Sequence, residues 1–369
     1  MTYQPIFVYL DNHGKEIFEQ PLSPNFHSSV TPRSMIEVGP YHYLIVGQDL
    51  SSNGWIAHVW WQPGGTVQQA YYQLKGLPHV QAVTLTSDRK ALVTALGKDT
   101  FWMAELDKNM TGVARSQSIA SPLGNQTTLL DGFTLGTSDG KTVMVAMGNV
   151  ADPNAGLVTT TTLARVISYA SDWKTVAWDR PVSQSTEQRF LDGIALADGK
   201  IALVGFSDSD LIHQYADSRD PSGARTWLDI VDGNGRDSSL FELDKDCYGE
   251  SGAFSAVAYN PVSKEIAVGV AAAYETSSPD AYFFDDNAVF KGQQSLSPGY
   301  GDGNQYYVDK FDLKSVMPLP GKEGFLFAAL ATSTQQVPNP DYGPYGDILN
   351  KPTTIDQPVL GQVVETVTR

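Results

Sequence analysis

Four stretches in the second half of the chain gather acidic, amide and tyrosine residues between apolar runs, at residues 208–225, 244–250, 302–309 and 341–347. The candidate ligand-binding residues in them are Asp208, Asp210, His213, Asp217, Arg219, Asp246, Glu250, Asp302, Asn304, Asp341, Tyr342 and Tyr345. Converging carboxylate and amide oxygens could hold a hard cation such as calcium, which takes roughly six to eight oxygen ligands. They could equally raise one another's pKa and supply a general acid or base. We expect a ligand-binding face here, with Asp208, Asp246 and Asp302 as candidate calcium ligands.

The competing interpretation is an ordinary structural role, because aspartate and asparagine commonly cap turns in loops. The run Asp208-Ser209-Asp210 resembles the start of a calcium loop, but the glycine and the distal glutamate of such a loop are absent. Residues 232–237 also resemble an ion-binding loop. Their position between two expected outer strands favours a plain turn.

Other catalytic or cofactor chemistry has little support in the sequence. The six histidines contain no pair at the i, i+2 or i, i+4 spacing of a compact zinc motif, and we expect only His27 and His213 on the loop face. Cys247 lies beside Asp246 and near Glu250, and acidic neighbours raise the pKa of a thiol, which argues against a nucleophile. The chain has no phosphate-binding glycine loop and no dinucleotide fingerprint, so we expect no nucleotide or flavin cofactor.

The elements that position these stretches are repeated pairs of strands. Residues 131–149 and 192–208 both open with Asp-Gly, reach an Asp-Gly-Lys turn and enter an apolar run, at 143–147 and 201–206. We interpret both Asp-Gly pairs of each copy as turn residues, because glycine adopts positive φ at little cost and aspartate bonds its own backbone. The apolar runs are too short for a typical helix and predict strands buried on both faces.

The whole chain follows the same plan. Six apolar hairpins begin near residues 34, 81, 131, 192, 255 and 314, and an amphipathic segment or hairpin follows each of them. Four strands in each unit, with insertions, is the pattern of propeller blades. The pattern resembles that of six-bladed β-propellers, and predicts an all-β fold of four-stranded antiparallel blades in a single domain, residues 1–369. It contains no WD or kelch signature, and one segment, residues 171–175, is similar to the Asp-box of sialidases without its glycine.

The resemblance implies how the ring closes and where the acidic stretches lie. The N-terminal hairpin, residues 6–22, has no inner pair before it, and the last unit has an inner pair and one further strand near residues 360–368. Joining N- and C-terminal strands in one blade would leave no open sheet edge. In propellers the loops between blades, and those between the second and third strands, gather on one face around the central channel. The four acidic stretches belong to these two loop classes.

Composition limits the possible partners. A formal charge of −16 disfavours nucleic acid and anionic membranes, and leaves room for a metal ion or a cationic partner. A single cysteine excludes an intramolecular disulfide framework, and no apolar stretch is long enough to span a bilayer. The opening residues do not form a signal peptide, so we expect a cytoplasmic protein, or a secreted one if Met1 was added to a mature chain.

Three functions are compatible with these features. The first is a binding module whose acidic, tyrosine-containing loop face holds a protein, peptide, glycan or small cationic ligand, since tyrosine buries a large area at low entropic cost. The alternative is an enzyme, a lactonase-like hydrolase or lyase with an acidic, calcium-bound site at the channel mouth. The third is a structural subunit of a larger assembly.

Overall fold

The structure is a computed structural model of the 369-residue chain. It describes residues 6–10, 16–22, 30–49, 51–124, 127–151, 160–180, 187–208, 225–243, 252–272, 280–295, 306–318, 323–337, 351–359 and 363–364. These residues form antiparallel strands and one short 3₁₀ turn, η1 (Ala197–Gly199), which confirms the predicted all-β class. No helix in the described ranges has the length and apolarity to cross a bilayer.

Five sheets are four-stranded antiparallel meanders in which each strand pairs with the next along the chain. Sheet 1 contains β3 (Val30–Gly39), β4 (His42–Asp49), β5 (Asn53–Trp60) and β6 (Gln68–Pro78). Sheet 2 contains β7 (Val80–Leu85), β8 (Ala91–Leu96), β9 (Thr100–Leu106) and β10 (Val113–Ala120). Sheet 3 contains β11 (Thr127–Gly136), β12 (Thr142–Ala151), β13 (Thr160–Tyr169) and β14 (Val176–Arg180). Sheet 4 contains β15 (Glu187–Ala195), β16 (Ile201–Asp208), β17 (Arg225–Val231) and β18 (Asp237–Leu243). Sheet 5 contains β19 (Gly252–Asn260), β20 (Glu265–Ala272), β21 (Asp280–Asp285) and β22 (Phe290–Ser295).

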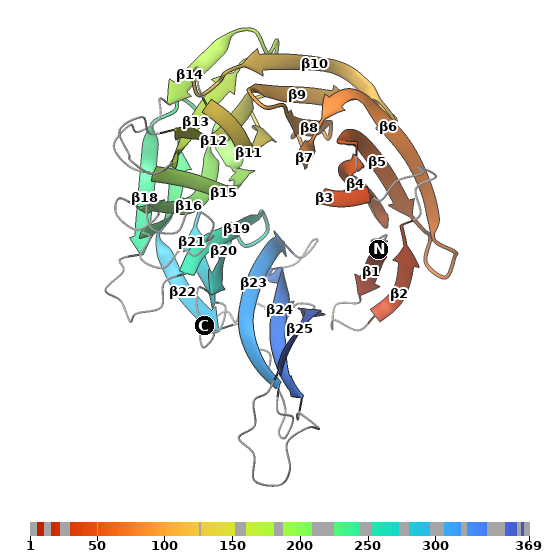
Figure 1. Ribbon diagram of the computed structural model, residues 1–369. Coiled ribbons are helices and arrows are strands. Elements are labelled where there is room, and N and C mark those ends of the chain that lie inside the picture. The colour runs from red at the N-terminus through yellow and green to blue at the C-terminus, as the bar shows by residue number, and fades with distance from the viewer. Residues whose placement is uncertain are drawn as a thin grey trace.

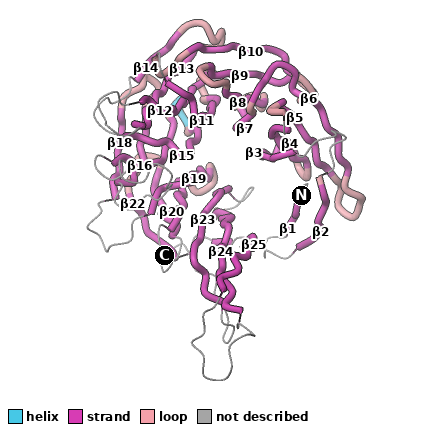
Figure 2. The backbone as a smooth tube through the Cα atoms, in the orientation of Figure 1, coloured by secondary structure: helices cyan, strands magenta, loops and turns pink. Residues whose placement is uncertain are grey.

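The two ends of the chain form less regular sheets. Sheet 6 contains β23 (Tyr306–Pro318), β24 (Phe325–Val337) and β25 (Lys351–Val359), and β26 (Val363–Val364) continues the pairing along β24. The N-terminal hairpin, β1 (Ile6–Leu10) and β2 (Glu16–Pro21), is a two-stranded sheet of its own. Figure 1 shows the sheets arranged around a common centre with the first strand of each sheet innermost, and Figure 2 shows that strands make up nearly all of the described backbone.

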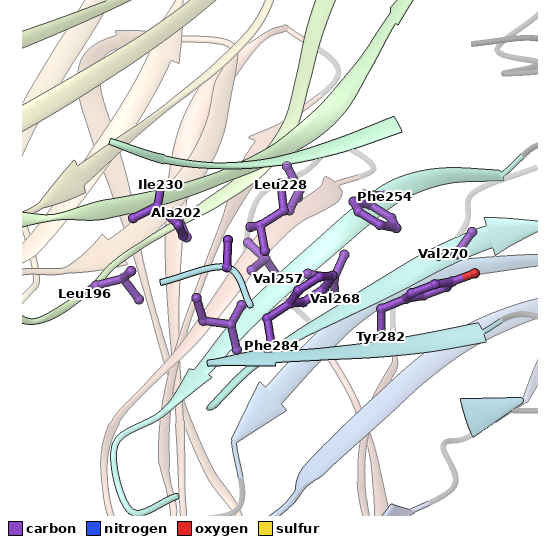
Figure 3. Close-up of a cluster of buried hydrophobic side chains, with 13 residues drawn as sticks. Leu196, Ala202, Leu228, Ile230, Phe254, Val257, Val268, Val270, Tyr282 and Phe284 are labelled. Carbon is purple, nitrogen blue, oxygen red and sulfur yellow. The ribbon is translucent and has the colours of Figure 1, made fainter. Parts of the chain in front are cut away.

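The core consists of apolar layers between consecutive sheets. In β12 the buried side chains alternate: Val143 and Val145 pack against sheet 4, whereas Met144 and Ala146 pack against sheet 2. Figure 3 shows the layer between sheets 4 and 5, where Leu228 of β17 lies opposite Phe254 of β19. The prediction that the apolar runs 143–147 and 201–206 are strands buried on both faces is therefore confirmed.

Aspartate-capped turns join the third and fourth strands of sheets 2 to 5. In residues 232–237 the Asp232 carboxylate accepts hydrogen bonds from the backbone N–H groups of Asn234 and Arg236, at 2.8 and 2.9 Å. Asp107, Asp172 and Asp285 cap the corresponding turns of sheets 2, 3 and 5 in the same way. Residues 232–237 thus form a plain turn, as their position between two outer strands predicted. Residues 171–175, the segment similar to a sialidase Asp-box, form another copy of the same turn.

The N-terminal hairpin packs on the outer part of sheet 1. Phe7 and Leu22 lie in one apolar cluster with Ile45, Trp55 and other residues of β4 and β5. Figure 1 shows the hairpin between sheet 6 and sheet 1. No pairing within the described ranges joins the hairpin to β25 or β26, so closure through one shared blade stays a prediction.

Candidate functional site

Most of the predicted ligand-binding residues lie outside the described residues. Asp208 is the last residue of β16, and only its backbone is described. Those outside are Asp210, His213, Asp217, Arg219, Asp246, Glu250, Asp302, Asn304, Asp341, Tyr342 and Tyr345, and also His27 and Cys247. Their convergence and their ligand roles therefore remain predictions.

The strands that carry these stretches end at one edge of their sheets. In sheet 4, Ser207 pairs with Arg225 and Thr226 pairs with Leu243, so the ends that border 209–224 and 244–251 lie together. In sheet 6, Tyr306 pairs with Gln335 and Val337 pairs with Lys351, which brings the borders of the later stretches to a common end as well. The antiparallel order thus brings the borders of the acidic stretches together within sheet 4 and within sheet 6, and a rim common to all four stretches stays a prediction.

The first strand of each sheet carries a β-bulge, and these strands are the innermost ones. In each strand the pairing register shifts, at Arg33, Gln81, Leu130, Leu191, Ser255 and Lys314. In β3 and β23 it shifts a second time, between Glu37 and Gly39 and between Val308 and Lys310. A bulge re-aims side chains and is common near functional sites. Leu130 and Leu191 at this position are exposed although they are apolar, and an aspartate follows each of them, Asp131 and Asp192. At the bulges of β11 and β15, the innermost strands therefore carry both apolar and acidic side chains.

Asp131 and Asp192 correct one interpretation of the sequence. The opening Asp-Gly of each repeat does not form a turn, because both aspartates lie inside a strand, directly after the bulged residue. Each carboxylate accepts a hydrogen bond from the N–H of the next residue, Gly132 or Gly193. The glycines are needed for a different reason, since a Cβ on Gly132 would lie 2.6 Å from the Phe101 ring of sheet 2.

Asp192 also joins two sheets. Its Oδ2 accepts a hydrogen bond of 2.9 Å from the backbone N–H of Val257 in β19, and its Oδ1 accepts one of 2.8 Å from Gly193. Burial raises the pKa of the Asp192 carboxyl to about 6, and these two donors oppose the rise. A carboxyl that titrates near neutral pH on the inner wall is the kind of group that can act as a general acid or base.

We expect Asp192→Asn to reduce the pH dependence of stability between pH 4 and 7. The pKa of the folded state is raised from 3.8 to about 6, so Asp192 favours folding below pH 3.8 and loses that contribution as the pH rises through 6. The full difference over this pH range is about 3 kcal/mol, at about 1.4 kcal/mol for each pKa unit. Urea unfolding at pH 4.5, 5.5 and 7 would measure it. Asp198→Asn, at an exposed position of η1 in the same sheet, is the matched control. Parallel pH curves for Asp192→Asn and the parent would contradict the assignment.

A second buried carboxylate lies between sheets 3 and 4. The Arg180 Nη1 atom donates a 2.8 Å hydrogen bond to Asp229 Oδ2, and Nη2 lies 2.6 Å from Asp237 Oδ1. Burial raises the pKa of Asp229 to about 6, although the Arg180 guanidinium opposes the rise. This group connects β14 of sheet 3 to β17 and β18 of sheet 4.

The structure brings together two histidines, His42 and His58, that their spacing in the sequence did not identify as a pair. His42 Nε2 lies 2.9 Å from His58 Nδ1, and His58 Nε2 lies 2.8 Å from the Met110 carbonyl oxygen of sheet 2. Burial, and then the nearby His58, lower the pKa of His42. The pair contacts neighbouring backbone, and the described part of the chain contains no group of three or more His, Cys, Asp or Glu side chains that could hold a metal ion. The adjacency of β4 and β5 creates the pair, and the only signal in the sequence is that both residues lie in apolar runs.

Comparison with known proteins identifies the architecture and no family. No protein-family model matches the chain, and no curated protein matches it. Among solved structures it is similar to Kuenenia stuttgartiensis hydrazine synthase, with a TM-score of 0.54 and 13% identity over 95% of this chain and 89% of that one. It is similar to the Pseudomonas aeruginosa periplasmic gluconolactonase PpgL, with a TM-score of 0.51 and 15% identity over 96% and 93% of the two chains. A protein of unknown function from Dyadobacter fermentans gives a TM-score of 0.52 and 10% identity over 97% and 98%. The chain has β-propeller architecture, and identities this low show the fold alone.

Proposed function

We propose that this protein is a propeller-type binding protein whose acidic loop face holds a cationic ligand. The observation that supports the proposal is that the strands bordering the acidic stretches end together within sheet 4, and end together within sheet 6. Carboxylates gathered on one rim repel one another, and a bound cation or a basic group of a partner would offset that cost. The net charge of −16 favours the same class of ligand.

Calcium is the cation that this donor chemistry suits best. Asp208, Asp246 and Asp302 would supply carboxylate oxygens, and Asn304 an amide oxygen. Other members of the face, such as Tyr342 and Tyr345, would contact a protein, peptide or glycan partner. We further propose that residues 1–369 form a single domain of six blades, closed by N- and C-terminal strands in one blade.

The test of a calcium-binding face is a comparison of single Asn variants with the parent. We expect the parent to bind calcium in isothermal titration and to melt at a lower temperature with a chelator, because a ligand that binds only the folded state stabilises it. Asp208→Asn, Asp246→Asn and Asp302→Asn should each weaken calcium binding by about tenfold or more and reduce the effect of the chelator. Asp198→Asn lies at the other end of sheet 4 and is the control. The calcium proposal is wrong if the chelator changes nothing and all three variants melt at or above the parent.

A second candidate function is supported by the inner-wall carboxyl. Asp192 has a pKa raised to about 6, which suits a general acid or base in a hydrolase or lyase. The fold it shares with a gluconolactonase makes lactones the first substrates to test. Lactone hydrolysis that disappears in Asp192→Asn, while the variant keeps its fold and its calcium affinity, would favour the enzyme over the binding protein.

A further inference from the structure

The two histidines of sheet 1 lie on the face of that sheet that is turned toward sheet 2. Leu44 of β4 pairs with His58 of β5, so His42, two residues before Leu44, is the diagonal neighbour of His58 on the same face. Leu44 belongs to the apolar layer between sheets 1 and 2. His58 is only 6% exposed, whereas His42, the first residue of β4, is partly exposed. One imidazole of the pair is therefore fixed in the layer, and the other reaches solvent.

The hydrogen bonds of His58 decide which of its nitrogens carries the hydrogen. His58 Nε2 lies 2.8 Å from the Met110 carbonyl oxygen, which can only accept, so Nε2 is the N–H group of the neutral ring. His58 Nδ1 then carries a lone pair, and it lies 2.9 Å from His42 Nε2, which donates to it. The lone pair of a buried, oriented imidazole thus points at a second imidazole.

The Met110 carbonyl group that orients His58 belongs to a rigid turn of sheet 2. Met110 adopts a left-handed conformation with φ of 55°, and its N–H donates a 2.8 Å hydrogen bond to the Asp107 carbonyl oxygen. The Asp107 carboxylate accepts further hydrogen bonds from the N–H groups of Asn109 and Thr111. A histidine that donates one ring N–H to a backbone carbonyl and presents its other nitrogen is the usual arrangement of a metal-binding histidine. His58 is held in this arrangement.

The separation of the two facing nitrogens matches a particular coordination geometry. If an ion lies about 2.0 Å from each nitrogen, nitrogens 2.9 Å apart subtend an angle of about 90° at the ion. Two ligands of a tetrahedral ion would be about 3.3 Å apart at the same bond length. An angle near 90° is that of adjacent ligands in a square-planar ion, and copper(II) prefers this geometry with imidazole ligands.

We propose that His42 and His58 bind a copper(II) ion through His42 Nε2 and His58 Nδ1, with water at the remaining positions. On binding, His42 moves its hydrogen from Nε2 to Nδ1, so the ring stays neutral and no proton is released. Within the described ranges no third His, Cys, Asp or Glu side chain completes a set of three, so the site is open to solvent and its ion exchanges. The inference does not depend on the proposed calcium face, because calcium takes oxygen ligands.

Copper(II) titration of the full chain tests this proposal. The titration is done near pH 7.5 with about 1 mM calcium present, so that the proposed calcium ligands are not available to copper. We expect binding of micromolar strength, and an electron paramagnetic resonance spectrum with two nitrogen ligands. His42→Asn and His58→Gln should each weaken the binding by about tenfold or more. The glutamine can still donate to the Met110 carbonyl oxygen but has no lone pair in place of Nδ1. His79→Asn, at an exposed histidine, is the control whose affinity should not change.

Trp60 offers a local readout of the same site. Its ring centroid lies 5.9 Å from that of His42, so bound copper(II) should quench part of the tryptophan fluorescence. Trp60→Phe should remove that part of the quenching and keep the affinity measured by calorimetry. Quenching that is unchanged in Trp60→Phe would place the copper elsewhere and overturn the proposal.

Three further outcomes would overturn the proposal. The first is equal copper affinity in the parent and both histidine variants. The second is a loss in His79→Asn as large as theirs, which would mean binding to exposed imidazoles in general. The third is a spectrum with oxygen ligands alone, which would assign the copper to carboxylates. The variants are compared after circular dichroism has shown the parent's fold, and if the buried position 58 does not tolerate glutamine, His42→Asn at the partly exposed position decides the result.

Discussion

Leu203→Asp and Val145→Asp are each expected to leave no soluble folded protein. Both side chains are fully buried in the layer between sheets 3 and 4. A carboxylate there would have no partner, and burying it costs several kcal/mol against a total stability of about 5 to 15 kcal/mol. The measurement is the soluble fraction after expression, followed by circular dichroism of any protein recovered.

Leu240→Asp is the matched control for this result. Leu240 belongs to the same sheet, but it is exposed on the outer strand β18. This variant should be soluble and should melt close to the parent. A soluble Leu203→Asp protein with the melting temperature of the parent would show that β16 is not an inner strand of the ring.

Arg180→Met is expected to lower the free energy of unfolding by about 3 kcal/mol at pH 8, because it leaves Asp229 buried without its cation. The size of the loss should depend on pH. The pKa of Asp229 is raised to about 6, so in the parent the carboxyl is ionised and paired at pH 8 but largely protonated at pH 5. Removing the arginine therefore costs less at pH 5, where there is little charge to leave unpaired. Urea unfolding of both proteins at the two pH values measures the difference.

The double variant Arg180→Met with Asp229→Leu separates the lost ion pair from the lost packing of the arginine side chain. It should recover most of the stability at pH 8, since a well-packed apolar pair can replace a buried ion pair at little cost. Equal losses at pH 5 and pH 8, with no recovery in the double variant, would show that Arg180 acts only through packing.

The local pattern of the sequence was enough to predict the strands. The runs 143–147 and 201–206 are apolar at every position, and such short runs are typical of strands that are covered on both faces. The repetition of hairpins along the chain indicated that the covering elements are other sheets. The turns were equally local, because Asp232 binds backbone N–H groups two and four residues ahead of it.

Contacts between residues far apart in the sequence were decided by the tertiary structure. Asp192 meets Val257, Arg180 meets Asp229 and His42 meets His58 only because neighbouring strands and sheets lie in a particular order and register. The Asp-Gly pairs at 131 and 192 show the limit of local evidence. An Asp-Gly pair favours a turn in isolation, yet a bulge and the close approach of an aromatic ring from the preceding sheet keep it inside a strand.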